Sequence, residues 1–134
     1  MPAPPPAPPL PSEGELRLLR ALWERGPSTV REVHAAVGAA TSWGYTTVLK
    51  LLQIMHGKGL VIRDESRRTH VYAAAAPPER TRGALVADLA ERAFGGSAAQ
   101  LALHALSAKP ATAAELEQLR DLLDQLDRRR SGRR

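Results

Sequence analysis

The stretch TTVLKLLQIMHGKGLVIRDESRRTHVY, residues 46–72, decides the fold. Its first half repeats apolar residues at the spacing of one helix face and then reaches two glycines, so it predicts a helix within 46–59. The apolar positions are Val48, Leu51, Leu52 and Met55. Two short β-type runs follow, 60–63 and 69–72, and the polar residues between them are typical of a hairpin tip. A helix followed at once by a β-hairpin is typical of the second half of a winged helix.

Two capping boxes upstream indicate the other helices of that domain. Residues 12–15 and 29–32 each pair a hydroxyl with a carboxylate three residues later, a pattern typical of helix starts. The expected core-facing positions are Leu16, Leu19 and Trp23 in the first helix and Val30, Val33 and Val37 in the second. Gly26 and Gly38 end these helices. Three helices and a hairpin predict a winged helix-turn-helix domain over residues 12–76.

The exposed side of the 46–59 helix carries residue types suited to DNA. Thr and Gln side chains can bond to base edges, and Lys can reach a phosphate or a guanine. The hairpin tip adds two arginines, placed to touch the DNA backbone or to enter a minor groove. The candidate DNA-binding residues are Tyr45, Thr46, Thr47, Lys50, Gln53, Arg67 and Arg68. The residue types alone fit a DNA-recognition helix and a solvated third helix of a bundle equally well. The hairpin that follows the helix favours the DNA-recognition helix.

Residues 77–127 predict a second, helical region. Three helical patterns follow one another, at 79–94, at 97–107 and after a third capping box at 112–115. About 50 residues of leucine-rich helix bury themselves poorly alone, so we predict a dimerisation domain in which the helices of two copies interleave. The candidate dimerisation residues are Leu85, Leu89, Leu101, Leu116, Leu119, Leu123 and Leu126. The alternative is that the leucine stripe packs within one chain against the winged helix.

The charge of the chain is unevenly placed. The sequence has 19 Lys and Arg against 14 Asp and Glu, a net charge of +5. The net charge is +3 for residues 12–76 and −3 for residues 77–127. Residues 128–134 contain five arginines and no acidic residue. The acidic helical region is therefore excluded as the nucleic-acid face. The seven prolines of residues 1–11 predict a disordered Pro-rich leader, and residues 128–134 predict a disordered Arg-rich tail.

The sequence offers little chemistry to an enzyme. Because it has no cysteine, disulfides, thiolate metal sites and cysteine nucleophiles are excluded. The histidines lack the i, i+4 pairing of helical zinc sites, and no Gly-rich phosphate loop follows a strand. They are His34, His56, His70 and His104. We therefore expect no enzyme activity, catalytic residue, metal or cofactor. Without a membrane-spanning run or a secretory signal, we expect a cytoplasmic protein that does not bind membranes.

Four segments of the chain resemble the BlaI/MecI/CopY family of penicillinase-type transcriptional repressors. They are LPSEGELRLLRALWERGPSTVREVH (10–34), YTTVLKLLQIMHGKGLVIR (45–63), HVYAAAAPPE (70–79) and the FGGS turn (94–97). The resemblance implies a homodimeric repressor that binds a palindromic DNA operator. Matched residues would be Thr46, Thr47 and Lys50 in the major groove, with the wing arginines on the backbone. The usual arginine-rich stretch late in the recognition helix reads QIM here, at 53–55, so a different operator sequence is expected.

The same resemblance implies a sensor-protease as a signalling partner. In the beta-lactamase branch of the family, a membrane sensor triggers cleavage of the dimerisation region at an Asn-Phe bond, whereas the matching position here is His104-Ala105. The copper-responsive branch uses a C-terminal cysteine motif that this sequence lacks. A second interpretation of the whole chain is a winged-helix adaptor that binds proteins and no specific DNA. A steep fall of affinity with added salt would favour DNA.

Overall fold

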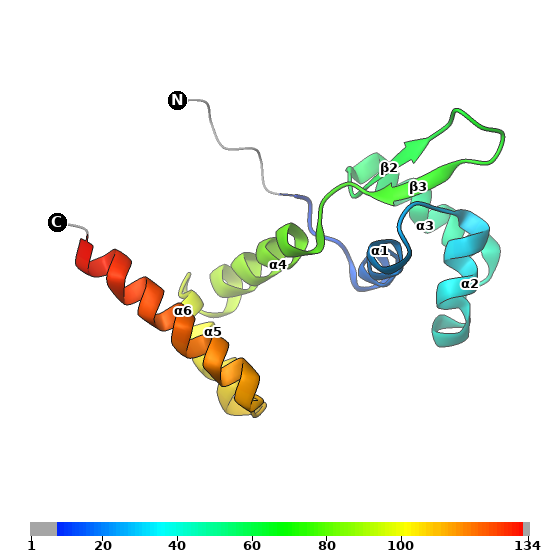
Figure 1. The fold of residues 1–134 in the computed structure, drawn as a ribbon. Coiled ribbons are helices and arrows are strands. Elements are labelled where there is room, and N and C mark those ends of the chain that lie inside the picture. Colours follow the sequence, from blue (N-terminus) through cyan, green and yellow to red (C-terminus); the bar gives the residue numbers. More distant parts are fainter. Residues whose placement is uncertain (1–7, 133–134) are drawn as a thin grey trace. The chain divides into compact units, whose positions relative to one another are not determined.

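The computed structural model describes residues 8–132, and it is mainly helical with one small sheet (Figure 1). The elements in chain order are α1 (Glu13–Arg25), β1 (Ser28–Thr29), α2 (Val30–Thr41), α3 (Tyr45–Lys58), β2 (Val61–Asp64), β3 (Val71–Ala74), α4 (Pro78–Ala93), α5 (Ala98–Ala108) and α6 (Ala113–Gly132). They form two compact units that divide between Leu89 and Ala90. The predicted fold class, helices with a β-hairpin wing, is confirmed.

Reciprocal side-chain caps fix where three helices begin. At α1 the Ser12 hydroxyl accepts from the Glu15 N–H at 3.2 Å, and the Glu15 carboxylate accepts from the Ser12 N–H at 2.8 Å. Equivalent pairs open α2 and α6, so all three predicted capping boxes are confirmed. The start of α3 differs, because its N-cap is Gly44 and no side chain caps it. Its C-cap, Gly59, has a φ of 84°, which glycine adopts far more readily than other residues.

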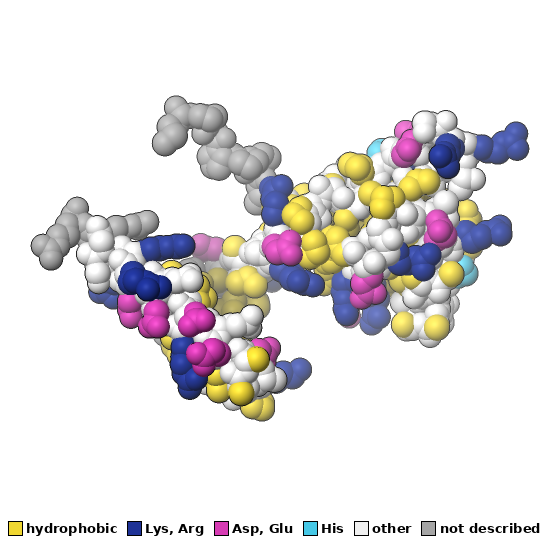
Figure 2. Space-filling model, in the orientation of Figure 1, with side chains coloured by type: hydrophobic (Ala, Val, Ile, Leu, Met, Phe, Trp, Pro, Cys, Tyr) yellow, Lys and Arg dark blue, Asp and Glu magenta, His cyan; other side chains and the backbone are white. Residues whose placement is uncertain are grey.

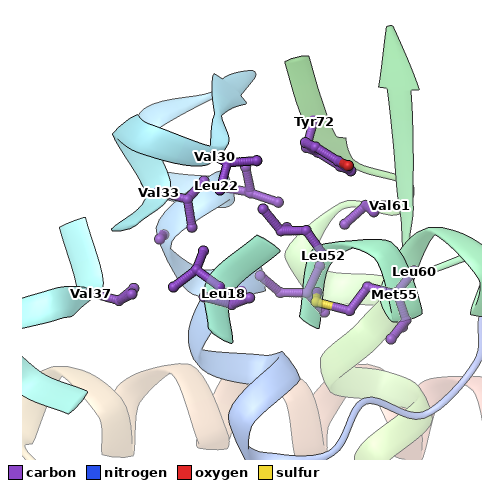
Figure 3. Close-up of a cluster of buried hydrophobic side chains, with 13 residues drawn as sticks. Leu18, Leu22, Val30, Val33, Val37, Leu52, Met55, Leu60, Val61 and Tyr72 are labelled. Atoms are coloured by element: carbon purple, nitrogen blue, oxygen red, sulfur yellow. The ribbon is translucent and has the colours of Figure 1, made fainter. Parts of the chain in front are cut away.

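One apolar cluster from α1, α2, α3 and the sheet forms the core of the first unit (Figure 3). Its most deeply buried members are Leu18, Leu19, Val33, Val48, Leu52, Met55, Val61 and Tyr72. The predicted core face of α1 is partly wrong: Leu16 and Trp23 are half-buried, and Leu18 and Leu22 are buried instead. The α1 sequence offers two overlapping apolar faces, and the neighbouring helices cover only one of them. Leu51 of α3 is likewise half-buried, at the edge of its stripe.

The predicted hairpin is confirmed, and it belongs to a three-stranded antiparallel sheet of order β1-β3-β2. In the hairpin, Val61 lies opposite Ala74 and Asp64 lies opposite Val71. The additional strand, β1, pairs with the other edge of β3. It escapes sequence analysis because two residues carry no periodicity. Since β1 runs directly into α2, the sheet attaches the start of α2 to the wing.

The first unit extends beyond its predicted boundary after Ala76 and reaches Leu89. Trp23 of α1 explains the difference. Its indole N–H donates to the Ala76 carbonyl oxygen at 3.0 Å, and the Arg82 guanidinium of α4 lies 5.9 Å from its ring centre. The first half of α4 is therefore anchored to the winged helix, and the first compact unit includes it.

The second unit contains the end of α4 together with α5 and α6. Because α6 continues to Gly132, the prediction of a disordered tail is wrong for residues 128–132. Arginines in the last turn of a helix interact favourably with its dipole, which favours the longer helix. Residues 1–7 of the predicted leader and 133–134 of the predicted tail lie outside the described residues. Within residues 8–132 no helix is both long and apolar enough to cross a membrane.

Candidate nucleic-acid interface

Helix α3 buries one face in the core and presents the opposite face to solvent. The buried residues are Val48, Leu52 and Met55. Thr46, Lys50 and Gln53 recur at intervals of four and three residues on the opposite face, and all three are exposed. Thr47 and Tyr45 are exposed on the flanks of that face, Tyr45 by 48%. A ligand can therefore reach every α3 residue that the sequence analysis selected.

A buried carboxylate attaches the end of α3 to the start of α1. The Lys58 ammonium donates to Glu15 Oε1 at 2.7 Å, and the Glu15 side chain is only 4% exposed. Burial raises the pKa of Glu15, but hydrogen bonds from Lys58 and Ser12 outweigh it and hold that pKa below its ordinary value. The carboxylate is therefore ionised at neutral pH, and it fixes the C-terminal end of α3 against α1.

An open groove of about 520 Å³ separates α3 from the wing. Its polar lining includes Arg31, Tyr45, Gln53, Arg63, Arg68 and His70. Of the predicted site residues, Tyr45, Gln53 and Arg68 meet here. Sequence analysis missed Arg31 and Arg63, because a lone arginine after a helix cap or in a strand looks like any solvated residue. Three arginines in one groove produce a positive potential that attracts a polyanion.

Arg63 is the most enclosed of the groove arginines, with its side chain 21% exposed. A side-chain hydrogen bond with Tyr72 raises the pKa of its guanidinium, so the charge is permanent. Its Nη2 lies 3.4 Å from Glu65 Oε2, and the other oxygen of Glu65 lies 3.9 Å from His70 Nε2. This network holds a cation in a fixed position on the wing wall of the groove.

The hairpin tip exposes Arg67 and Arg68. Figure 2 shows Lys and Arg side chains projecting from this end of the wing. The turn is supported by Asp64, whose carboxylate accepts from the Ser66 N–H at 2.9 Å, and hydrogen bonds with Ser66 lower the pKa of Asp64. Arg68 lines the groove, whereas Arg67 is exposed at the tip and is not among the groove-lining residues. The two arginines therefore face different parts of a ligand.

The leucines of the predicted dimerisation region are largely uncovered. Leu89, Leu116, Leu123 and Leu126 are exposed by 44%, 41%, 60% and 45%, and Leu85, Leu101 and Leu119 are half-buried. No residue described in α5 or α6 is buried. An open groove of about 530 Å³ between these two helices is lined in part by Leu106, Leu119 and Leu122. An apolar surface of this kind marks an interaction site in soluble proteins.

The His104–Ala105 bond, which matches the family's cleavage position, lies inside α5. His104 is exposed; its Nδ1 is 3.0 Å from the Gln100 carbonyl oxygen, and its ring centre is 5.2 Å from that of Phe94. Proteases prefer extended, exposed segments, so a bond within a helix is a poor substrate until the helix opens. The sensor-protease partner stays a prediction.

Among residues 8–132, no group of three His, Asp or Glu side chains is clustered closely enough to hold a metal ion.

Three packed helices, a β-hairpin wing and a cationic groove beside the exposed face of the third helix define a winged-helix protein. Residues 11–125, most of the chain, match the family described as penicillinase repressor. The chain belongs to this family of transcriptional regulators, which confirms the resemblance noted in its sequence. Its members are regulators and not enzymes.

Individual relatives match the chain over shorter lengths. The transcriptional regulator BlaI of two strains of Mycobacterium tuberculosis is 41% identical over 76 residues, which are 56% of this chain and 52% of that protein. The chain thus spans about half the length of these curated relatives. The solution structure of Bacillus licheniformis BlaI, as a monomer in complex with the blaP half-operator, is 20% identical with a TM-score of 0.48, over 55% of this chain and 89% of that one. The DNA-binding domain of the repressor BlaI gives the same identity and TM-score over 56% and 90%.

Proposed function

We propose that this chain is a homodimeric transcriptional repressor that binds a palindromic DNA operator through α3 and the wing. The observation that carries the proposal is the groove in which Tyr45 and Gln53 of α3 meet the wing arginines Arg63 and Arg68, beside the exposed face of α3. Membership of the penicillinase repressor family supports it. Repression then follows from occupancy, because a protein bound at a promoter blocks access of the transcription machinery.

The side chains of the interface divide between base readout and phosphate binding. Thr46, Thr47 and Gln53 carry hydroxyl and amide groups that pair with base edges in the major groove. Lys50 reaches a phosphate or a guanine from the middle of the same face. The groove arginines bind the phosphates beside α3, and Arg67 extends from the tip toward the more distant backbone or a minor groove. The phosphate contacts give affinity and register, while the α3 face gives specificity.

The dimer is supported by leucines that stay uncovered within one chain. Leu116, Leu119, Leu123 and Leu126 are spaced by three and four residues along α6, which places them on one helix face. Pairing with a second copy removes this face from water. A twofold dimer carries two α3 helices related by the same symmetry, so its operator has two inverted half-sites.

Selection of bound duplexes from a random DNA pool tests the proposal directly. We expect an inverted repeat, with half-sites separated by one helical turn of DNA or a multiple of it. On the selected duplex, a variant carrying Lys50→Ala and Arg68→Ala should lose affinity and show a salt slope lower by about 0.9 per lost phosphate contact. Arg120→Ala is the matched control, because it removes an exposed arginine from α6.

Two results would contradict the proposal. A pool that yields no common sequence would favour the protein-binding adaptor over the DNA-binding repressor. A Lys50→Ala and Arg68→Ala variant that binds the selected duplex as tightly as the unaltered chain would place the DNA contact elsewhere on the molecule.

A further inference from the structure

We propose that His34 of α2 is a positioning residue that fixes the first turn of α3 and thereby the specificity of DNA binding. The proposal rests on the proposed function, because it concerns how the α3 face is aimed at base edges. His34 is half-buried, and it is not among the residues that line the groove beside the wing. Its role would be exerted through the two residues it contacts.

The turn between α2 and α3 lacks the usual support at the start of a helix. Gly44, the N-cap of α3, offers no side chain to the amides of the first turn. Ser42 before it has a φ of 58°, an uncommon value for a residue other than glycine. The Thr41 hydroxyl supports the entry to the turn, since it accepts from the Trp43 N–H at 3.2 Å and donates to the Val37 carbonyl at 2.9 Å. At the exit from the turn, the Trp43 ring packs against the core, and the Trp43 carbonyl oxygen has a separate side-chain partner.

His34 is this partner, and it contacts residues on both sides of Gly44. Its Nε2 lies 2.9 Å from the carbonyl oxygen of Trp43, and because a carbonyl only accepts, Nε2 is the donor. The imidazolium and the neutral tautomer with hydrogen on Nε2 both make this bond. The same ring meets the ring of Tyr45 edge to face, with centres 6.4 Å apart and planes at 87°. One side chain thus joins α2 to the residues immediately before and after the N-cap of α3.

Because the His34 contacts lie at the first turn of α3, they are expected to control the sequence specificity of DNA binding and not its general affinity. Tyr45 is the first residue of α3, and Thr46 and Thr47 follow it in the same turn. Loss of the His34 contacts allows that turn to shift relative to α2, which misaligns the threonines with base edges. The arginines of the groove lie on α2 and the wing and keep their places. Specific binding should therefore weaken while binding to unrelated DNA does not.

The experiment compares the full-length chain and its variants on two labelled duplexes of equal length, the selected operator and a scrambled sequence. For His34→Ala we expect roughly tenfold weaker binding to the operator, the size of effect that one lost hydrogen bond produces, with the same affinity for the scrambled duplex and the same salt slope. His56→Ala is the matched control, because His56 is a half-buried histidine at the other end of α3. It should leave the ratio of the two affinities unchanged.

A double-mutant cycle tests whether His34 acts through its neighbour. If the first turn is held as inferred, the variant with both His34→Ala and Tyr45→Ala should lose less operator affinity than the product of the fold-losses of the two single variants. Where urea unfolding shows that His34→Ala is too unstable to measure, His34→Phe takes its place, since it keeps a ring and removes the donor, and it should still lower the affinity ratio several-fold.

Two outcomes would overturn the inference. One is an unchanged operator-to-scrambled ratio in a folded His34 variant; the other is an equal fall on both duplexes, which indicates a merely structural role. If the unaltered chain itself shows no preference for any selected duplex, the proposed function fails and the inference falls with it. The unaltered chain therefore distinguishes the two failures.

Discussion

Neutralising Glu15 should remove a pH-dependent part of the stability of the winged helix. The pKa of this carboxyl is lower in the folded chain than its ordinary value, so its ionised form favours folding. That contribution is fully present above the unfolded pKa of about 4.3 and is lost as the pH falls through the lower folded value. We therefore expect the free energy of unfolding to decrease from pH 7 to pH 3 by more in the unaltered chain than in Glu15→Gln.

The geometry sets the size of this effect. The carboxylate accepts two short hydrogen bonds, from Lys58 at 2.7 Å and from the Ser12 N–H at 2.8 Å. Hydrogen bonds to charged groups contribute about 1.5–3 kcal/mol each when buried. Because the Lys58 side chain is 41% exposed, solvent screens its share. We expect Glu15→Gln to lose about 2 kcal/mol at pH 7, or roughly 8–16 °C in Tm for a domain of this size.

Urea unfolding followed by circular dichroism at pH 7 and pH 3 measures this difference. The protein concentration must be kept constant, because dimerisation adds to apparent stability. Glu13→Gln is the matched control, since Glu13 is an exposed carboxylate in the same helical turn. Equal pH dependence for Glu15→Gln and Glu13→Gln would refute the reasoning, because it would mean that the hydrogen bonds from Lys58 and Ser12 to the ionised carboxylate contribute nothing to folding.

Three further predictions concern other parts of the chain. Leu123→Glu should give a monomer mass by light scattering at micromolar concentration where the unaltered chain gives a dimer, and a persistent dimer would place the interface elsewhere. Leu52→Ala should reduce the free energy of unfolding by about 2–5 kcal/mol, measured in urea, because Leu52 is fully buried; a loss below 1 kcal/mol would contradict the packing. Gly59→Ala should destabilise by about 1–2 kcal/mol since its φ is 84°, whereas Gly57→Ala within α3 should stabilise by about 0.5–1 kcal/mol, and thermal unfolding should rank the two variants in this order.

Local signals in the sequence were sufficient for much of the fold. The capping boxes at Ser12, Thr29 and Thr112 and the hairpin tip between β2 and β3 each depend on residues a few positions apart. Features that depend on distant partners could not be found in this way. The end of the first unit at Leu89 depends on Trp23, which contacts residues more than fifty positions later in the chain.

In the candidate site, too, only the part that depends on nearby residues could be predicted from the sequence. The exposed face of α3 was predictable, because a helical period with buried Val48 and Leu52 leaves the positions of Thr46 and Lys50 on the other side. The wing wall of the groove could not be predicted from the sequence. Arg63 becomes part of it only because β2 pairs with β3 beside α3, and that pairing is a property of the tertiary fold.

The contacts that hold α3 in place are different from those proposed to join two copies of the chain. Recognition of one DNA half-site and dimerisation therefore depend on different residues. The middle of the helix is fixed by Met55 and its neighbours in the core, its end by the bond from Lys58 to Glu15, and its start by the contacts of His34. All of these lie within the first compact unit, so one winged helix holds its recognition surface in place without a partner. The α6 leucines, in contrast, belong to the other compact unit. Disrupting Leu123 should therefore abolish cooperative binding to a two-half-site operator, while each half-site is still bound with the affinity and sequence preference of a single domain.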